Sequence, residues 1–469
     1  MFAGLSYVAW DNDVYYYQRI AMAFDEGNSW AYMNHYAPPL FAWLWGIVGV
    51  THTVTIILLQ AVLSVLCLWP ISRMCQGVDK KIPLWVALGF VAFQASLMRY
   101  GMQPLPDTLF LLLHLCLLAE LTSEKVRPVR LMLLLFVLPW VRYDTFIFIA
   151  IYFIWALVMG QRNKKVLAAM LIGAVLGLGA LSLNSYLRHD SWVLTSRMAA
   201  LDSPVGEDQL VEGQTLWHIL ANKGEKAPNY TEEQISQALL DKNARESKNA
   251  TSTGTLLKNF KELVLWKLWH HEQLNALVLL LVLLGLWRAP KRVWLLTMLA
   301  VLSVGVYSFL GPRERYLSFS SPLFLIVAAR GMGLMPWKQL MYSVFLCWLL
   351  WQLKIGSYHY RHPENQLIEH QLAGKWIARH GKKQGPIMSR EGVSSIYAQR
   401  QWRRLPTSSD LQELMAYAKK EGVSYFVVGD RYFLKKRPWQ GFLLNDFPKS
   451  SVKTFTVGKY HAYIYELNN

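Results

Sequence analysis

The chain has few of the residues that build disulfide or metal-held frameworks. Only 4 of its 469 residues are cysteine, and these lie singly in or beside apolar runs, at Cys67, Cys75, Cys116 and Cys347. Without a CxxC motif or a pairing spacing, we expect neither a disulfide framework nor a metal cluster. Acidic residues are also scarce: 31 Asp and Glu stand against 48 Lys and Arg, which gives a net charge of +17.

The sequence also lacks a visible internal repeat, which argues against transporter folds built from inverted repeats. Its first residues show no basic stretch followed by an apolar run, so no signal peptide is visible. Fewer residues precede Asp11 than the ~20 that a membrane span needs. We therefore expect either an external N-terminus or a first helix encoded upstream of this reading frame.

Long apolar runs dominate the rest of the sequence. Hydrophobic residues make up 53% of the chain and aromatic residues 13%. Such runs predict a polytopic α-helical membrane protein, because a helix needs ~20 apolar residues to cross a bilayer of ~30 Å. The expected spans are 53–74, 83–98, 105–121, 129–141, 145–160, 166–187, 274–288, 293–310, 317–330 and 337–356.

Basic residues fall at alternate ends of successive runs. Because the excess of Lys and Arg in membrane proteins lies in cytoplasmic loops, we expect these ends to be cytoplasmic. The basic residues follow topology rather than form a patch, so we expect no nucleic-acid partner. They are Arg73, Lys80, Lys81, Lys125, Arg127, Arg130, Arg162, Lys164, Lys165, Arg288, Lys291, Arg292, Arg330 and Lys338.

The remaining polar segments then fall on the opposite, external side, where several loops can form one site. They are the N-terminal stretch, 99–107, 142–144, the loop 188–273, 313–316 and everything after 356. The expected organisation is an external catalytic loop with amphipathic helices (1–52), a transmembrane bundle (53–356) and a small soluble external domain (357–469).

The expected external domain has the pattern of an α/β fold, and basic residues outnumber acidic ones in it. Glycine stops and β-branched or aromatic runs predict its elements. They are helices over 364–380 and 410–421, closed by Gly381 and Gly422, a buried strand over 423–428 and a hairpin around Gly458.

The stretch 10–41, directly before the first long apolar run, is rich in charge and aromatic rings. A solvated tail is one interpretation. Against it, the aromatic run 15–17 suits a membrane interface, and apolar residues recur at helical spacing over 14–27. Pro38 and Pro39 are expected to act as a stop.

Four features of this stretch together resemble the first loop of the GT-C glycosyltransferases: an acidic pair, a Tyr-rich helix ending in Ile-Ala, Gly-x-x-Trp and Pro-Pro-Leu-Phe. The nearest branch is the group of protein mannosyltransferases, aminoarabinose transferases and bacterial RgtA/B/C/D-like transferases. The resemblance also covers the loop before Asp107, the break at Arg142 and the Arg315-Tyr316 pair.

The resemblance implies a GT-C-type bundle that transfers a monosaccharide from a polyprenyl phosphate on the external membrane face. The acceptor is then a hydroxyl of a lipid, a polysaccharide or a protein of the cell envelope. The implied location is a bacterial inner membrane, with the site on its periplasmic side. The alternatives are a lipid-glycan flippase or transporter, which favours ionisable residues in mid-span, and a non-catalytic membrane subunit.

Asp13 matches the catalytic aspartate of the family, because Tyr17 follows it by four residues and Ile20 by seven. Asp11 is the second choice. Transfer to a hydroxyl needs a base within hydrogen-bond reach of its proton, and a carboxylate can supply it. The structural alternative is that Asp13 caps the helix beginning at Val14, and one residue can do both.

Asp107 matches the second acid of the family. Its structural alternative is an N-cap for a helix beginning at Thr108. In some relatives such acids hold a divalent cation, and in others no metal is needed. Because this chain lacks a dense acid cluster, we assign neither a metal nor another cofactor.

The leaving group in such a reaction is a lipid phosphate, so the resemblance implies cations beside it. Arg142 matches at a break between two apolar runs, and Arg313, Arg315 and Tyr316 match at another external helix end. Snorkelling to the interface is the alternative for each cation. For Arg142 we favour a functional role, because Arg142, Tyr143 and Asp144 together interrupt the apolar stretch.

The first loop also departs from the family pattern. Tyr16 stands where relatives often have Arg, and Ala37 stands where they often have Lys or His before Pro-Pro-Leu. His35 is the substitute that the sequence offers, and Arg19 and Tyr17 are further candidates for contact with the substrate.

Overall fold

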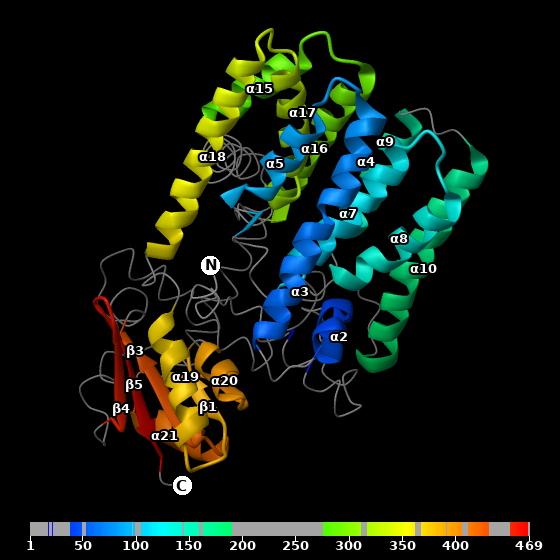
Figure 1. The fold of residues 1–469 in the computed structure, drawn as a ribbon. Coiled ribbons are helices and arrows are strands. Elements are labelled where there is room, and N and C mark those ends of the chain that lie inside the picture. Colours follow the sequence, from blue (N-terminus) through cyan, green and yellow to red (C-terminus); the bar gives the residue numbers. More distant parts are fainter. Residues whose placement is uncertain are drawn as a thin grey trace, which may run out of the picture. The chain divides into compact units, whose positions relative to one another are not determined.

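The computed structural model divides the chain into two compact units (Figure 1). The larger unit comprises 16–201 and 250–361, and the smaller comprises 1–15, 202–249 and 362–469. Within them the structure describes residues 17, 21, 38–48, 53–95, 97–98, 105–142, 145–158, 163–189, 275–310, 317–361, 367–390, 392–405, 411–430 and 451–467. The described part is mostly helical and ends in a small sheet.

The larger unit is a bundle of helices. Apolar runs of helical length form its elements, as the sequence predicts. The helices are α2 (Pro39–Val48), α3 (Thr53–Leu66), α4 (Leu68–Val78), α5 (Leu84–Ala92), α7 (Asp107–Thr122), α8 (Pro128–Val141), α9 (Thr145–Val158), α10 (Lys164–His189), α15 (Ala276–Leu286), α16 (Lys291–Leu310), α17 (Ser321–Gly333) and α18 (Lys338–Arg361).

Helix α7 lies inside this bundle. Its side chains are apolar on every face and almost all of them are buried, which is the pattern of an interior helix. It packs against α3, α4 and α8. Glycines allow other helices to approach closely: a Cβ on Gly285 of α15 would collide with the backbone of Val327 in α17, and a Cβ on Gly173 of α10 with that of Met132 in α8.

The outer surface of the bundle carries many large apolar side chains. Val65, Leu187 and Leu280 are each more than half exposed, and many more are at least partly exposed. Among the described residues, two helical segments are long and apolar enough to cross a membrane, Thr55–Val78 and Lys164–Leu183. Shorter apolar helices accompany them, among them Pro128–Val141 and Thr145–Val158.

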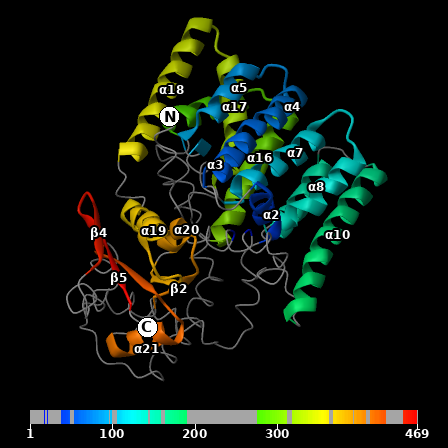
Figure 2. The same cartoon turned by 60° about the horizontal axis from the view of Figure 1, so that its bottom comes forward.

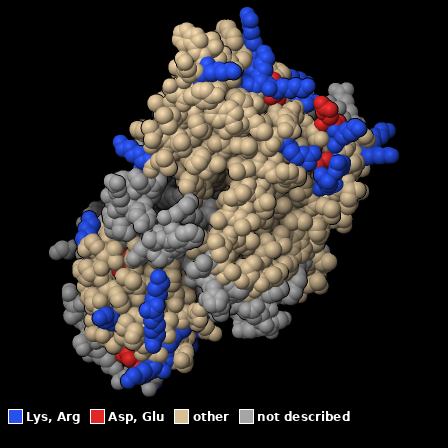
Figure 3. Space-filling view, in the orientation of Figure 1, with Lys and Arg blue, Asp and Glu red and all other residues tan. Residues whose placement is uncertain are grey.

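Charged side chains gather at one end of the bundle, here called the basic end and defined by Asp79, Glu120, Arg292 and Arg330. Figure 3 shows Lys and Arg clustered at the top of the view and a largely uncharged flank below. Asp107 lies at the opposite end of α7 from Glu120, about 20 Å away at 1.5 Å per residue. The bundle therefore separates Asp107 from the basic end.

The smaller unit contains a five-stranded sheet with the order β2-β1-β3-β5-β4 (Figure 2). The β1 pairings with β2 and β3 are parallel, and the β5 pairings with β3 and β4 are antiparallel. The elements are α19 (Ile368–His380), β1 (Ile387–Ser389), α20 (Val393–Ala398), β2 (Trp402–Arg404), α21 (Leu411–Lys420), β3 (Tyr425–Gly429), β4 (Lys453–Val457) and β5 (Tyr460–Glu466).

Apolar residues of both faces of this sheet form its core. Leu414 and Ala418 of α21 pack with Phe426 on one face, and Ala373 and Ile377 of α19 pack on the other. The predicted helices and strands are present here. Gly422 has a positive φ of 64°, in keeping with its predicted role as a helix stop.

One helix was not among the predicted elements. Pro39 is the first residue of α2, whose apolar sequence continues to Val48. Whether Pro38 and Pro39 end the segment before them lies outside the described residues. Proline is well suited to the first turn of a helix, since its missing N–H has no intrahelical partner there. The apolar run that follows Pro39 therefore forms a helix with this proline as its first residue.

Candidate functional site

Two residues predicted from separate motifs meet at the end of the bundle away from the basic end. Asp107 is the first residue of α7, and Arg142 follows the last residue of α8. The backbone is extended at Arg142, and α9 resumes at Thr145. The Thr145 hydroxyl donates a hydrogen bond of 2.6 Å to the Arg142 carbonyl, which stabilises this break.

Asp107 and Arg142 form an ion pair between the Arg142 Nη1 and the Asp107 Oδ1. The side chains are only 12% and 5% exposed. The Arg142 guanidinium also lies over two phenyl rings, 5.5 Å from the centroid of Phe110 and 5.4 Å from that of Phe319. Rings at this distance attract a cation, so the pair and the rings together fix the guanidinium.

This arrangement bears on the structural alternatives for both residues. The N-cap position of α7 is Pro106, not Asp107, and the helix begins at Asp107 rather than at Thr108. The Asp107 carboxylate accepts a hydrogen bond from Arg142. Arg142 is directed into the bundle rather than extended to an interface. Helix dipoles favour both charges, since the acid is at a helix N-terminus and the cation follows a helix C-terminus.

A cavity of about 120 Å³ reaches Asp107 between α3, α5 and α7. Most of its lining is apolar, with Val65, Leu68 and Leu111 among the residues concerned. Its hydroxyl groups come from Ser64, Thr108 and Ser318. The cavity thus combines an apolar wall with a charged group at one place, which is the usual composition of a ligand site.

Amide side chains support the irregular backbone beside this cavity. Gln60 Nε2 donates to the carbonyl of Leu105, with 2.6 Å between the atoms. The N–H of Ala95 donates to Gln352 Oε1, 2.8 Å away, just beyond the end of α5. Backbone groups away from water need such partners. These glutamines were not among the predicted residues, although each is a polar residue inside an apolar run.

A second polar pair lies further along α7. His114 and Tyr152 are completely buried, and the tyrosine hydroxyl is hydrogen-bonded to Nδ1 of the histidine. The imidazole also contacts Phe110 and Phe319, the two rings that flank Arg142. The sequence signal for His114 is a lone histidine in an apolar run, which by itself more often indicates a core residue than a ligand.

Of the predicted first-loop residues, the structure describes only Tyr17. It is buried, and its ring meets that of Phe41 edge-on, with 5.7 Å between the centroids. In this structure Tyr17 is thus a packing residue of the bundle. The other predicted site residues lie outside the described residues: Asp11, Asp13, Arg19, His35, Arg313, Arg315 and Tyr316.

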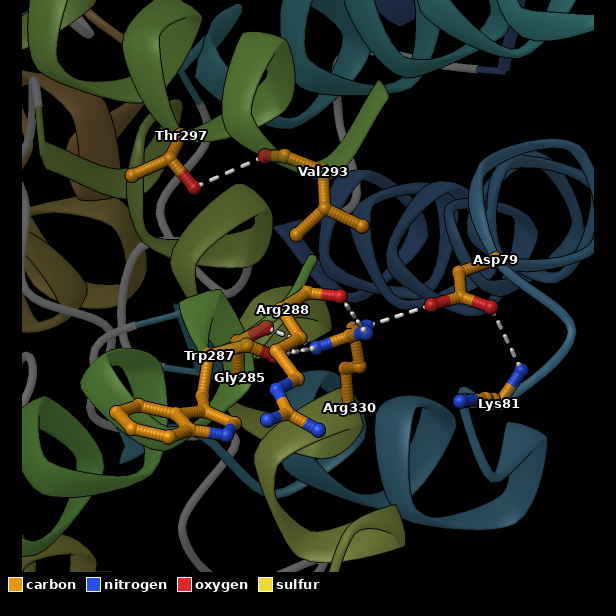
Figure 4. Close-up of polar contacts among 8 residues, drawn as sticks. All are labelled: Asp79, Lys81, Gly285, Trp287, Arg288, Val293, Thr297 and Arg330. Carbon is orange, nitrogen blue, oxygen red and sulfur yellow. Dashed lines mark hydrogen bonds and ion pairs between the residues drawn. The ribbon is translucent and has the colours of Figure 1, made fainter. Parts of the chain in front are cut away.

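A different buried pair occupies the basic end (Figure 4). Arg330, 2% exposed, forms an ion pair with Asp79 at 2.5 Å. Its guanidinium also donates to the carbonyls that end α15: those of Gly285, Trp287 (3.2 Å) and Arg288 (3.3 Å). Burial raises the pKa of Asp79, but the hydrogen bonds from Arg330 and Lys81 and their charges outweigh it and hold that pKa below its ordinary value.

Within the described residues, no group of three or more His, Cys, Asp or Glu side chains is placed to hold a metal ion. The first-loop acids lie outside those residues, so the assignment of no cofactor stays a prediction.

No protein-family model matches the sequence, and no curated protein sequence matches it significantly. Solved structures do resemble it. The oligosaccharyltransferase of Archaeoglobus fulgidus, tethered with an acceptor peptide containing the NVT sequon, is 10% identical with a TM-score of 0.58. The same enzyme, AglB, in complex with an inhibitory peptide and a dolichol-phosphate is 11% identical with a TM-score of 0.54. Both matches cover 93% of this chain and 67% of the other.

A third structure, ArnT from Cupriavidus metallidurans in the apo state, is 12% identical with a TM-score of 0.42, over 98% of this chain and 94% of that chain. At such identities a structural likeness is informative about fold. The likeness to AglB shows that this chain has the fold of that oligosaccharyltransferase structure.

Proposed function

We propose that this chain is a GT-C-type membrane glycosyltransferase. It moves a monosaccharide from a polyprenyl-phosphate donor to a hydroxyl of a cell-envelope acceptor. The observation that carries the proposal is the buried Arg142–Asp107 pair beside an apolar cavity. An ion pair in such surroundings is costly, and ionisable groups inside apolar bundles are typically functional. The AglB fold supports the same class, because AglB is an oligosaccharyltransferase.

In this proposal the apolar flank of the bundle lies in a bacterial inner membrane. The basic end faces the cytoplasm, because loops rich in Lys and Arg stay on that side. Asp107 and Arg142 then face the periplasmic side. The exposed apolar side chains and the two candidate spans support insertion in a membrane. The separation of Asp107 from the basic end along α7 supports placing the two on opposite sides of it.

The donor lipid enters the cavity sideways from the bilayer. Two lining residues, Val65 and Met98, are exposed on the outer surface of the bundle, so the apolar wall continues from that surface to Asp107. The phosphate of the donor then reaches Arg142, whose planar fork can serve both a phosphate and the Asp107 carboxylate. Arg315 is the second cation of this site, and Arg313, Arg19 and His35 are further contacts.

Asp13 takes the proton from the acceptor hydroxyl, and the freed oxygen pair attacks the anomeric carbon of the sugar. The bond between that carbon and the phosphate oxygen breaks, which inverts the configuration. The lipid phosphate leaves with both electrons of the bond, and Arg142 and Arg315 stabilise the charge that develops on it. Asp107 holds Arg142 in position throughout.

The test is transfer by the purified protein from labelled polyprenyl-phosphate sugars. Asp13→Asn removes the base and should abolish transfer while the protein stays folded. Glu124→Gln, at an exposed acid near the basic end, is the matched control and should transfer sugar as the wild type does. Full activity of Asp13→Asn removes that residue from the mechanism. A wild type that carries lipid-linked sugar across vesicles without transferring it is a flippase instead.

A further inference from the structure

His114 is a buried polar residue of the bundle that the proposed reaction leaves without a role. It is fully buried, and Nε2 of its ring has no hydrogen-bond partner among the described residues. Leaving a buried polar group unpaired is destabilising, because it loses its hydrogen bonds with water. An apolar side chain at this position of an apolar helix avoids that cost, so the presence of the imidazole calls for an explanation.

The surroundings of His114 connect it to Arg142. Its ring centroid lies 6.1 Å from that of Phe110 and 6.4 Å from that of Phe319. These two rings meet edge-on, with 4.9 Å between their centroids at 88°, and the Arg142 guanidinium lies over both of them. The imidazole and the guanidinium therefore contact the same two phenyl rings.

His114 also contacts two residues of α9. Tyr152 hydrogen-bonds to Nδ1, and the Phe148 ring meets the imidazole at 90°, with 5.7 Å between the centroids. Tyr152 lies about two helical turns beyond Thr145, the residue that begins α9 directly after the break at Arg142. The hydrogen bond thus ties α9 to α7 close to the point where Arg142 leaves α8.

We infer that His114, through its hydrogen bond to Tyr152, is a positioning residue that holds Phe110 and Phe319 in place and thereby fixes the guanidinium of Arg142 for the donor phosphate. The hydrogen bond sets the spacing of α7 and α9, and the rings transmit it. The inference rests on the proposed function only in naming the donor phosphate as the ligand. The placement of Arg142 can be tested without a ligand.

The first experiment needs no ligand. Tyr152→Phe removes the hydroxyl and keeps the ring, and Tyr342→Phe, an exposed tyrosine of α18, is the matched control. The full-length protein in detergent is treated with phenylglyoxal, which modifies arginine, and modification of Arg142 is followed by mass spectrometry. We expect Tyr152→Phe to raise the rate at Arg142 about threefold or more, because freed rings expose the guanidinium. An unchanged rate overturns the inference.

The second experiment adds undecaprenyl phosphate as the probe. We expect Tyr152→Phe to weaken its binding about fivefold to tenfold and to raise the donor KM in proportion, with kcat changed less. In an Arg142→Lys background the same substitution should change binding less than twofold, because residues that act through one group are not additive.

The outcomes of the two experiments separate the two ideas. Additive effects, or a lower melting temperature with unchanged binding, assign His114 a purely structural role and overturn the inference. If the wild type does not bind the probe, the proposed donor is wrong, and the arginine modification still decides whether Tyr152 positions Arg142.

Discussion

The bundle holds a buried Arg–Asp pair at each end, and the two pairs differ in what surrounds the arginine. Arg330 donates to backbone carbonyls at the end of α15 as well as to Asp79. Arg142 lies over two phenyl rings and pairs with Asp107, which borders a cavity. Burial and ion pairing alone therefore do not distinguish Arg142, for which we propose a function, from Arg330.

The surroundings of the arginine carry that distinction. Carbonyls at a helix C-terminus lack intrahelical partners, so the carbonyl contacts of Arg330 complete a helix end. Aromatic faces attract a guanidinium through its positive charge and do not act as acceptors of directional hydrogen bonds. The Phe110 and Phe319 contacts therefore hold Arg142 without completing a helix end.

Helix dipoles add a second difference. Asp107 begins α7, where the partial positive charge of the helix stabilises a carboxylate. Asp79 follows the last residue of α4, where the partial negative charge opposes one. Asp79 thus depends on Arg330 and Lys81 for its charge. Breaking the two pairs should accordingly have different consequences.

The largest expected effect is on catalysis at the Arg142 end. Arg142→Ala removes the cation that stabilises the departing phosphate, and we expect transfer to fall about 100-fold to 1000-fold, as when an oxyanion-binding donor is lost. Initial rates with a labelled lipid-linked donor measure this. Arg130→Ala, a cation that is 46% exposed at the basic end, is the control and should keep the wild-type rate. A rate for Arg142→Ala within a fewfold of the wild type contradicts the proposed site.

The next effect is on stability at the basic end. Arg330→Ala leaves Asp79 and the carbonyls ending α15 without their partner, and we expect a loss of about 3–5 kcal/mol in the free energy of unfolding. Unfolding in detergent, followed by tryptophan fluorescence, measures this loss. Lys338→Ala, an exposed cation nearby, should leave stability unchanged. If Arg330→Ala unfolds like the wild type, the carbonyl contacts of Arg330 contribute little.

Many helices of the bundle could be predicted from the sequence. A long apolar run forms a helix whose surface is either buried or in contact with lipid, so the run itself marks the helix. Predicted runs at 105–121 and 129–141 correspond to α7 and α8. The start of α2 was missed, since proline begins helices as readily as it ends them. Periodicity locates helices and strands. Whether a proline ends one helix or begins the next depends on the residues that follow it.

The candidate site was only partly accessible to sequence. Asp107 and Arg142 were proposed from separate motifs, but no spacing rule predicts that side chains 35 positions apart pair with each other. Arg330 was assigned to the basic loops, yet it is buried. Its partner Asp79 lies 251 positions away, so the local sequence gives no sign of this pair. His114 was missed since its proposed role depends on Tyr152 and Phe319, which are distant from it in the sequence. Pairings of this kind are tertiary, and one sequence does not encode them in its local pattern.

The smallest expected effect is a pH dependence confined to the Asp79 pair. The folded protein holds the pKa of Asp79 below its ordinary value, so the unfolded chain binds this proton more readily than the folded one. The contribution of the charged pair to stability is then present above the ordinary pKa of aspartate, about 4, and is lost as pH falls through the lower folded value. Asp79→Asn lacks this contribution at every pH.

We therefore expect the melting temperature of Asp79→Asn to lie below that of the wild type at pH 7, with the gap closing at pH values below about 4. Thermal unfolding of both proteins across this range measures the gap. A gap that stays constant down to pH 3 would show that the Arg330 contacts with the helix end, and not the charge of Asp79, stabilise this end of the bundle.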